Sequence, residues 1–116
     1  MSNTPTTAPI HLSAALIVKN EAAKLEACLQ SIAGWVDEIV IVDSGSSDAT
    51  LEIAQKYGAK VYSHTDWQGF GMQRQRAQYH VQGAWVMWLD ADERVTPELK
   101  QSLQAALNQY RDQQNV

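Results

Sequence analysis

Two carboxylates, Asp90 and Asp92, directly follow the apolar run Trp85–Leu89. The run predicts a strand buried on both faces, whose carboxyl end opens into a polar crevice. Neighbouring negative charges are costly there unless a cation sits on them. Mg²⁺ usually takes one or two protein carboxylates together with substrate phosphates. The acid pair therefore favours a metal–nucleotide site.

Three other interpretations compete for the same acids. A Ca²⁺ loop counted from Asp90 needs glycine at its sixth position, where Val95 stands, so that interpretation fails. An aspartyl-phosphatase loop prefers Thr or Val where this chain has Arg94, and it fits poorly. Alternatively, both aspartates solvate a turn, with Asp92 or Glu93 favouring the start of the next helix. On this stretch alone, the solvated turn stays open.

Polar residues also follow two other predicted strands. Lys19, Asn20 and Glu21 follow the apolar run Leu12–Val18, and Asp43 follows a β-branched run that begins at Glu38. Strands that alternate with helices predict an α/β fold with a doubly wound, mostly parallel sheet. With strand order 3-2-1-4, all three groups converge on one crevice at the switch point. Asp43 either binds a base or ribose there, or caps the next helix.

Start and stop signals divide the rest of the chain into elements. The first expected helix is capped by Asn20, with Glu21 in its first turn and Gly34 at its end, and the second is capped by Ser47 or Asp48 and stops at Gly58. A strand is expected over Lys60–Ser63, followed by a helix from about Met72 to Val81 that Gly83 closes. Thr96 and Pro97 begin a last helix that reaches about Tyr110.

Composition bounds the class of protein. The 116 residues suffice for one domain, and their net charge of −4 with scattered basic residues argues against nucleic-acid binding. A single cysteine, Cys28, excludes an internal disulfide and is compatible with a reducing compartment. Residues 1–10 are polar and are expected to be a disordered leader before a domain over 11–116. With no signal peptide or membrane-spanning run, a cytoplasmic location is the expectation.

Two arginines and one tryptophan complete the candidates. Arg74 and Arg76 fall near a predicted helix start, where cations are mildly unfavourable, so each either faces an anionic partner or belongs to a solvated helix face. Trp67, in a loop with two glycines, is the tryptophan most expected to be exposed.

Four motifs together give the chain a resemblance to a known family. It resembles the amino-terminal, Rossmann-like half of family 2 glycosyltransferases of the GT-A fold. It is most similar to the bacterial branch that builds the lipopolysaccharide or lipooligosaccharide core, including β-1,4-glucosyltransferases. The resemblance covers roughly Leu12 to Leu103. Its motifs are Leu16 to Glu21, Glu38 to Thr50, Gly69 to Arg74, and Trp88 to Glu93.

The resemblance implies a role for each motif. The base and ribose of a nucleotide-diphosphate sugar would lie against Val18, Lys19, Asn20, Glu21 and Asp43, with Arg74 beside the nucleotide. Asp90, Ala91 and Asp92 would form the D-x-D motif, with Asp90 and Asp92 catalytic and Asp92 on Mg²⁺ or Mn²⁺. It further implies inverting transfer from a UDP-sugar such as UDP-glucose to a saccharide or lipopolysaccharide-core acceptor, with peripheral association at the inner face of the cytoplasmic membrane.

The chain also departs from the family pattern. Lys19 stands where many members carry an aromatic residue before the strand-end asparagine, which leaves UDP a preference. The chain ends soon after the D-x-D motif, so we expect a truncated domain that lacks the base carboxylate and is inactive alone. We also expect self-association through an exposed sheet edge at Trp85–Leu89. The alternative function is a nucleotide-binding or regulatory module without chemistry.

Overall fold

The computed structural model describes residues 12–114, with side chains described as far as residue 109. The predicted leader, residues 1–10, lies outside the described residues. Four parallel strands form one sheet in the order β3-β2-β1-β4, as predicted. They are β1 (Leu12–Val18), β2 (Glu38–Asp43), β3 (Lys60–Ser63) and β4 (Trp85–Leu89). β1 pairs with β2 from Ser13 to Val18 and with β4 from Leu12 to Leu16.

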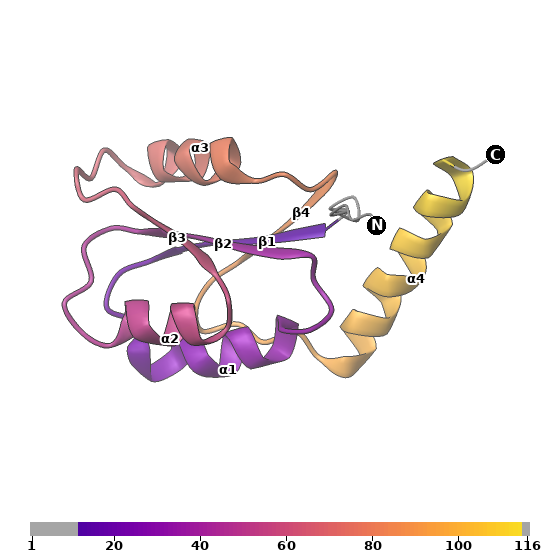
Figure 1. Ribbon diagram of the computed structural model, residues 1–116, viewed down its shortest axis with the longest axis horizontal. Helices are drawn as coiled ribbons and strands as arrows, with labels where there is room; N and C mark the ends of the chain where they lie inside the picture. The colour runs from indigo at the N-terminus through magenta and orange to yellow at the C-terminus, as the bar shows by residue number, and fades with distance from the viewer. Residues whose placement is uncertain (1–11, 115–116) are drawn as a thin grey trace, which may run out of the picture.

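Helices cover both faces of this sheet, which makes it doubly wound. α1 (Ala22–Ile32) and α2 (Thr50–Lys56) lie on one face and α3 (Phe70–His80) on the other, whereas α4 (Pro97–Gln114) extends away from the sheet (Figure 1). The apolar face of α1 packs onto β1 and β2, where Leu16, Leu25, Leu29 and Ile41 are fully buried. This core fixes the carboxyl ends of β1 and β2 side by side.

The start of α1 differs from the prediction. Its N-cap residue is Glu21, and Asn20 has a positive φ of 53° and makes no cap to the helix. The backbone N–H of Ala22 instead donates to Asp48, which also accepts from the backbone N–H of Thr50 at the start of α2. The predicted cap by Asn20 is therefore wrong, because the Asp48 carboxylate accepts from the N–H groups at both helix starts. The prediction of Glu21 as a first-turn acid is wrong as well, because Glu21 is itself the N-cap residue.

Three other boundaries move. α3 begins two residues before the predicted Met72, and α4 continues beyond Tyr110 to Gln114. Gly83 does not close α3, which ends at His80. A Cβ at Gly83 would lie 2.5 Å from Ser13 Oγ, so close approach to β1 requires the glycine.

The prediction that β4 is buried on both faces is wrong. Trp85 is 49% exposed and the other four residues of β4 are only partly buried. Among the described residues β4 is the edge of the sheet, paired only with β1. α4 leaves an apolar groove of about 350 Å³ beside it, lined by Leu12, Trp85, Val86, Met87, Leu103, Ala106 and Leu107. No helix within residues 12–114 is long and apolar enough to cross a membrane.

Candidate functional site

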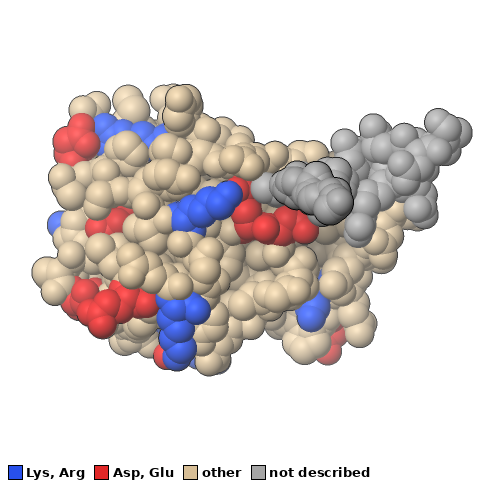
Figure 2. All heavy atoms as spheres, in the orientation of Figure 1, with Lys and Arg blue, Asp and Glu red and all other residues tan. Residues whose placement is uncertain are grey.

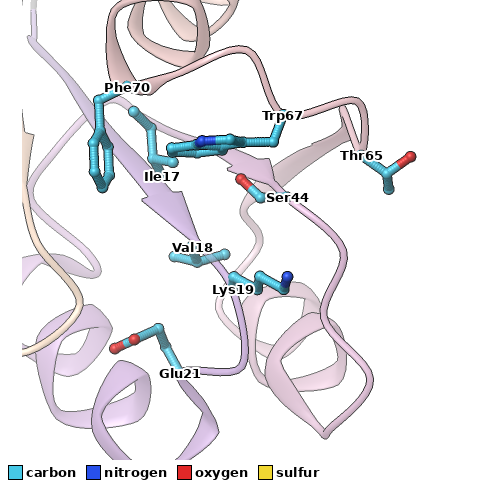
Figure 3. Close-up of a pocket in the computed structure, with 8 residues that line it drawn as sticks. All are labelled: Ile17, Val18, Lys19, Glu21, Ser44, Thr65, Trp67 and Phe70. Atoms are coloured by element: carbon cyan, nitrogen blue, oxygen red, sulfur yellow. The ribbon is translucent and has the colours of Figure 1, made fainter.

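A cavity of about 490 Å³ opens at the carboxyl ends of β1 and β2 (Figure 3). Three of the residues predicted to bind the nucleotide line it, namely Val18, Lys19 and Glu21. The remaining lining residues are Ile17, Ser44, Thr65, Trp67 and Phe70. The cavity therefore lies at the β1 and β2 part of the predicted crevice, and neither Asp90 nor Asp92 is among its lining residues.

Asn20 joins the loops after β1 and β2. Its backbone N–H donates to Ser46 Oγ over 2.9 Å, and its Oδ1 accepts from the backbone N–H of Ser47 over 2.7 Å. The N–H of Glu21 donates to Thr50 Oγ1 over 2.9 Å. Because Asn tolerates a positive φ, this turn forms without glycine. The three bonds fix the floor of the cavity.

Asp43 is buried at 1% exposure, next to the cavity rather than in its lining. Its Oδ2 accepts from the backbone N–H groups of Gly45 and Ser46, each over 3.0 Å, and its Oδ1 accepts from Ser46 Oγ. The carboxylate thus shapes the loop after β2 and does not cap α2, whose N-cap residue is Ala49, so the capping alternative is wrong. Its contact with a nucleotide stays a prediction.

The acid pair lies at the end of β4, with Asp90 and Asp92 exposed and Ala91 buried in the core. Glu93 closes the turn between them: its Oε1 accepts from the N–H of Asp90 over 2.7 Å, and its own N–H donates to the Asp90 carbonyl. Burial, followed by the charges of Glu93, Asp92 and Asp90, raises the pKa of the Cys28 thiol to about 11. The end of β4 therefore carries three negatively charged side chains, Asp90, Asp92 and Glu93.

The donor set at this strand end limits how a metal could bind. Within the described residues no group of three or more His, Cys, Asp or Glu side chains could hold an ion by itself. Asp90 and Asp92 can supply one or two oxygens, so the other ligands must come from elsewhere. That requirement fits Mg²⁺ or Mn²⁺ on a diphosphate, because Mg²⁺ is commonly bound by one or two carboxylates plus phosphate oxygens.

The structure separates the two arginines. The exposed Arg74 holds its guanidinium 4.5 Å from the ring centre of Trp88, so it reaches toward the strand that carries the acid pair. Arg76 instead pairs with Asp66 over 2.9 Å and donates to Gln73 Oε1 over 2.7 Å. Arg76 therefore braces the loop before α3. Elsewhere, the face shown in Figure 2 carries interspersed acidic and basic side chains.

Five lining residues were missed from the sequence: Ile17, Ser44, Thr65, Trp67 and Phe70. The available signal was the run Trp67-Gln68-Gly69-Phe70-Gly71, which places two aromatic residues in a glycine-rich turn. Trp67 is 50% exposed, as expected, but its position over the cavity depends on the loop conformation.

Comparison with known proteins agrees with this fold and site. The family model "Glycosyl transferase family 2" matches residues 13–116. Lipopolysaccharide core biosynthesis glycosyltransferase LpsC from Rhizobium meliloti is 38% identical over 96 residues, 79% of this chain and 35% of the relative. The crystal structure of S. aureus TarS 1–349 superposes with a TM-score of 0.75 at 25% identity, covering 87% of this chain and 33% of that one.

Another solved structure holds ligands. Glucosyl-3-phosphoglycerate synthase from Mycobacterium tuberculosis, in complex with Mn²⁺, UDP and phosphoglyceric acid, has a TM-score of 0.62 at 28% identity, covering 72% of this chain and 34% of that one. The chain belongs to glycosyl transferase family 2. Its sheet and helices have the arrangement of the GT-A glycosyltransferases. It spans about a third of the length of its curated relatives, 35% for two that are 38% identical.

Proposed function

We propose that this domain binds the donor of a sugar transfer, a nucleotide-diphosphate sugar with UDP preferred, together with Mg²⁺ or Mn²⁺. One observation carries the proposal: the cavity is lined by Ile17, next to Leu16, which pairs with Leu89 just before the exposed acid pair, and that pair cannot complete a metal site alone. The Mn²⁺–UDP complex of the mycobacterial synthase supports the same pairing of ligands.

The residues divide the donor between them. Val18, Lys19, Asn20, Glu21 and Asp43 lie at the strand ends that would receive base and ribose, and Arg74 lies on the side of β4. Asp92 would be the protein ligand of the ion, and Asp90 would lie beside it in the D-x-D motif. Bound there, a divalent cation stabilises the negative charge that develops on the departing diphosphate.

We further propose the class of reaction, inverting transfer to a saccharide acceptor of the lipopolysaccharide-core type at the inner face of the cytoplasmic membrane. The similarity to LpsC supports the acceptor class. Inversion needs a carboxylate to deprotonate the acceptor hydroxyl. We assign no such base among residues 12–114. A binding module without chemistry would share the donor site and differ only in turnover.

The donor proposal is tested by titrating the protein with UDP and UDP-glucose by calorimetry, with Mn²⁺, with Mg²⁺ and with a chelator. We expect binding only with metal, because the two aspartates repel the phosphates without a bridging cation. Asp92→Asn should remove the metal-dependent part and change the free energy of unfolding by less than about 0.5 kcal/mol, as for most surface substitutions. Glu52→Gln, at an exposed acid on α2, is the control. Equal binding in chelator would refute the metal role.

We also propose that the 116-residue polypeptide associates with itself through β4 and does not transfer sugar alone. An edge strand with apolar side chains invites strand addition, and β4 carries Val86 and Met87 beside an open apolar groove. Sedimentation velocity over a concentration series should show association that Val86→Lys weakens. A stable monomer would contradict the proposed self-association. Turnover of UDP-glucose with a lipopolysaccharide-core acceptor would contradict the proposed inactivity.

A further inference from the structure

The upper wall of the cavity consists of two aromatic rings, Trp67 in the loop before α3 and Phe70 at the first residue of α3 (Figure 3). Trp67 and Phe70 lie edge to face, with ring centres 4.8 Å apart and an angle of 89° between their planes (Figure 3). Trp67 is 50% exposed and Phe70 69% exposed, although both line the cavity. Large apolar rings left half in water beside a cavity provide a surface that a flat ligand can cover.

The loop that carries Trp67 is held in place by buried polar contacts. Gln73 is fully buried, and its Nε2 donates to Ser44 Oγ over 2.8 Å and to the His64 carbonyl over 3.0 Å. Its Oε1 accepts from Arg76, whose guanidinium also pairs with Asp66. These bonds tie the loop to the end of β2. The rings are therefore positioned before any ligand arrives, which lowers the entropic cost of binding.

The sheet order sets the distance between the β2 side of the cavity, lined by Ser44, and the acid pair. β1 lies between β2 and β4, so the β2 side of the cavity and the end of β4 are two strand spacings apart, about 10 Å. A ligand that spans both positions has a flat apolar group at one end and phosphates with a cation at the other. A nucleoside diphosphate has this layout, with the ribose between.

Together these observations assign the rings a role that the sequence motifs do not contain. Resting on the proposed donor function, we infer that the Trp67 ring forms the stacking surface for the donor's nucleobase, with Phe70 supporting that ring at a right angle. Lys19, at the end of β1, offers no ring, so the aromatic contact comes from the loop between β3 and α3. Stacking uses the face common to every base, so this stacking surface adds affinity while discriminating little between bases.

The test compares a ligand with a base and a ligand without one. UDP and inorganic pyrophosphate are titrated, each with Mn²⁺, into the protein and into Trp67→Ala. Loss of stacking should weaken UDP binding about 5- to 150-fold. Pyrophosphate binding should change less than about twofold, because its partners are Asp90 and Asp92. Trp67→Phe should keep most of the UDP affinity while losing the quenching of tryptophan emission by UDP.

Tyr79→Ala is the matched control, since Tyr79 is an 85% exposed aromatic residue on the same helix as Phe70 but outside the cavity lining. It should leave both affinities unchanged. Wild-type UDP affinity in Trp67→Ala would overturn the inference while leaving the donor site intact. Equal loss of UDP and pyrophosphate would overturn it too, because the loop would then only shape the phosphate site. A wild-type protein that binds no UDP would refute the donor function itself and, with it, this inference.

Discussion

β2 carries a buried carboxylate at each end, and the two have different uses. Glu38 at the amino end accepts from Ser13 Oγ over 2.5 Å and from the backbone N–H of Gln82 over 2.6 Å, and it pairs with Lys60 over 3.1 Å. These partners belong to β1, β3 and the segment before β4. The Asp43 carboxylate at the carboxyl end accepts from Gly45 and Ser46 in its own loop.

The comparison shows how one strand separates stability from function. The carboxylate at the amino end joins three distant segments and closes that end of the sheet. At the carboxyl end, Asp43 satisfies its oxygens locally and leaves the neighbouring residues facing an open cavity. In open α/β sheets, ligands bind in the crevice outside the carboxyl ends of the strands.

The largest effect on stability is expected from Glu38→Ala. Removing the carboxylate leaves Ser13 Oγ and the Gln82 N–H without their buried acceptor, which should cost about 2–4 kcal/mol of the free energy of unfolding. Urea denaturation measures the loss, with Glu52→Ala as the exposed control. Folded Glu38→Ala should bind UDP with Mn²⁺ within about twofold of wild type. A large loss of affinity without a loss of stability would break the division between the two ends.

An intermediate effect, on affinity alone, is expected from Arg74→Ala. If Arg74 faces the nucleotide, its removal should cost about 1–3 kcal/mol of UDP binding, the range for a charge-assisted hydrogen bond. Arg76→Ala should cost far less affinity and instead loosen the loop that Asp66 anchors. Calorimetry and thermal unfolding on both variants separate the effects. Losses of affinity that are small and equal would return Arg74 to the solvated-face interpretation.

The sequence predicted those features that depend on local pattern. Hydrophobic runs and turn residues predicted four strands that alternate with helices, and therefore a parallel sheet, which is confirmed. The order 3-2-1-4, which is also confirmed, was a hypothesis that no local pattern gives. The burial of β4 was mispredicted because an apolar run cannot reveal whether a second neighbour is present. The network around Glu38 was missed because its partners Ser13 and Gln82 lie 25 and 44 residues away. The positions of Trp67 and Phe70 required the conformation of a loop, which pattern alone does not give.

The smallest effect tests the amino end by pH. Burial of Glu38 raises its pKa, but the hydrogen bonds from Ser13, the Gln82 N–H and Lys60 together lower the pKa by more than burial raises it. The net pKa therefore lies below its ordinary value of 4.5. The folded state then holds its proton less tightly than the unfolded state. The stabilisation is therefore fully present above pH 4.5 and is lost as pH falls through the lowered, folded-state pKa.

Glu38→Gln removes this titration while keeping a side-chain acceptor. We expect the free energy of unfolding of wild type to fall more steeply than that of Glu38→Gln between about pH 4.5 and 3, measured by urea denaturation at each pH. Asp48, whose pKa its bonds to Thr50 also lower, titrates in both proteins and cancels in the comparison. If the free energy of unfolding fell equally steeply in both proteins, the charge of Glu38 would not stabilise the sheet. Glu38 would then differ from Asp43 only in the segments that its hydrogen bonds join.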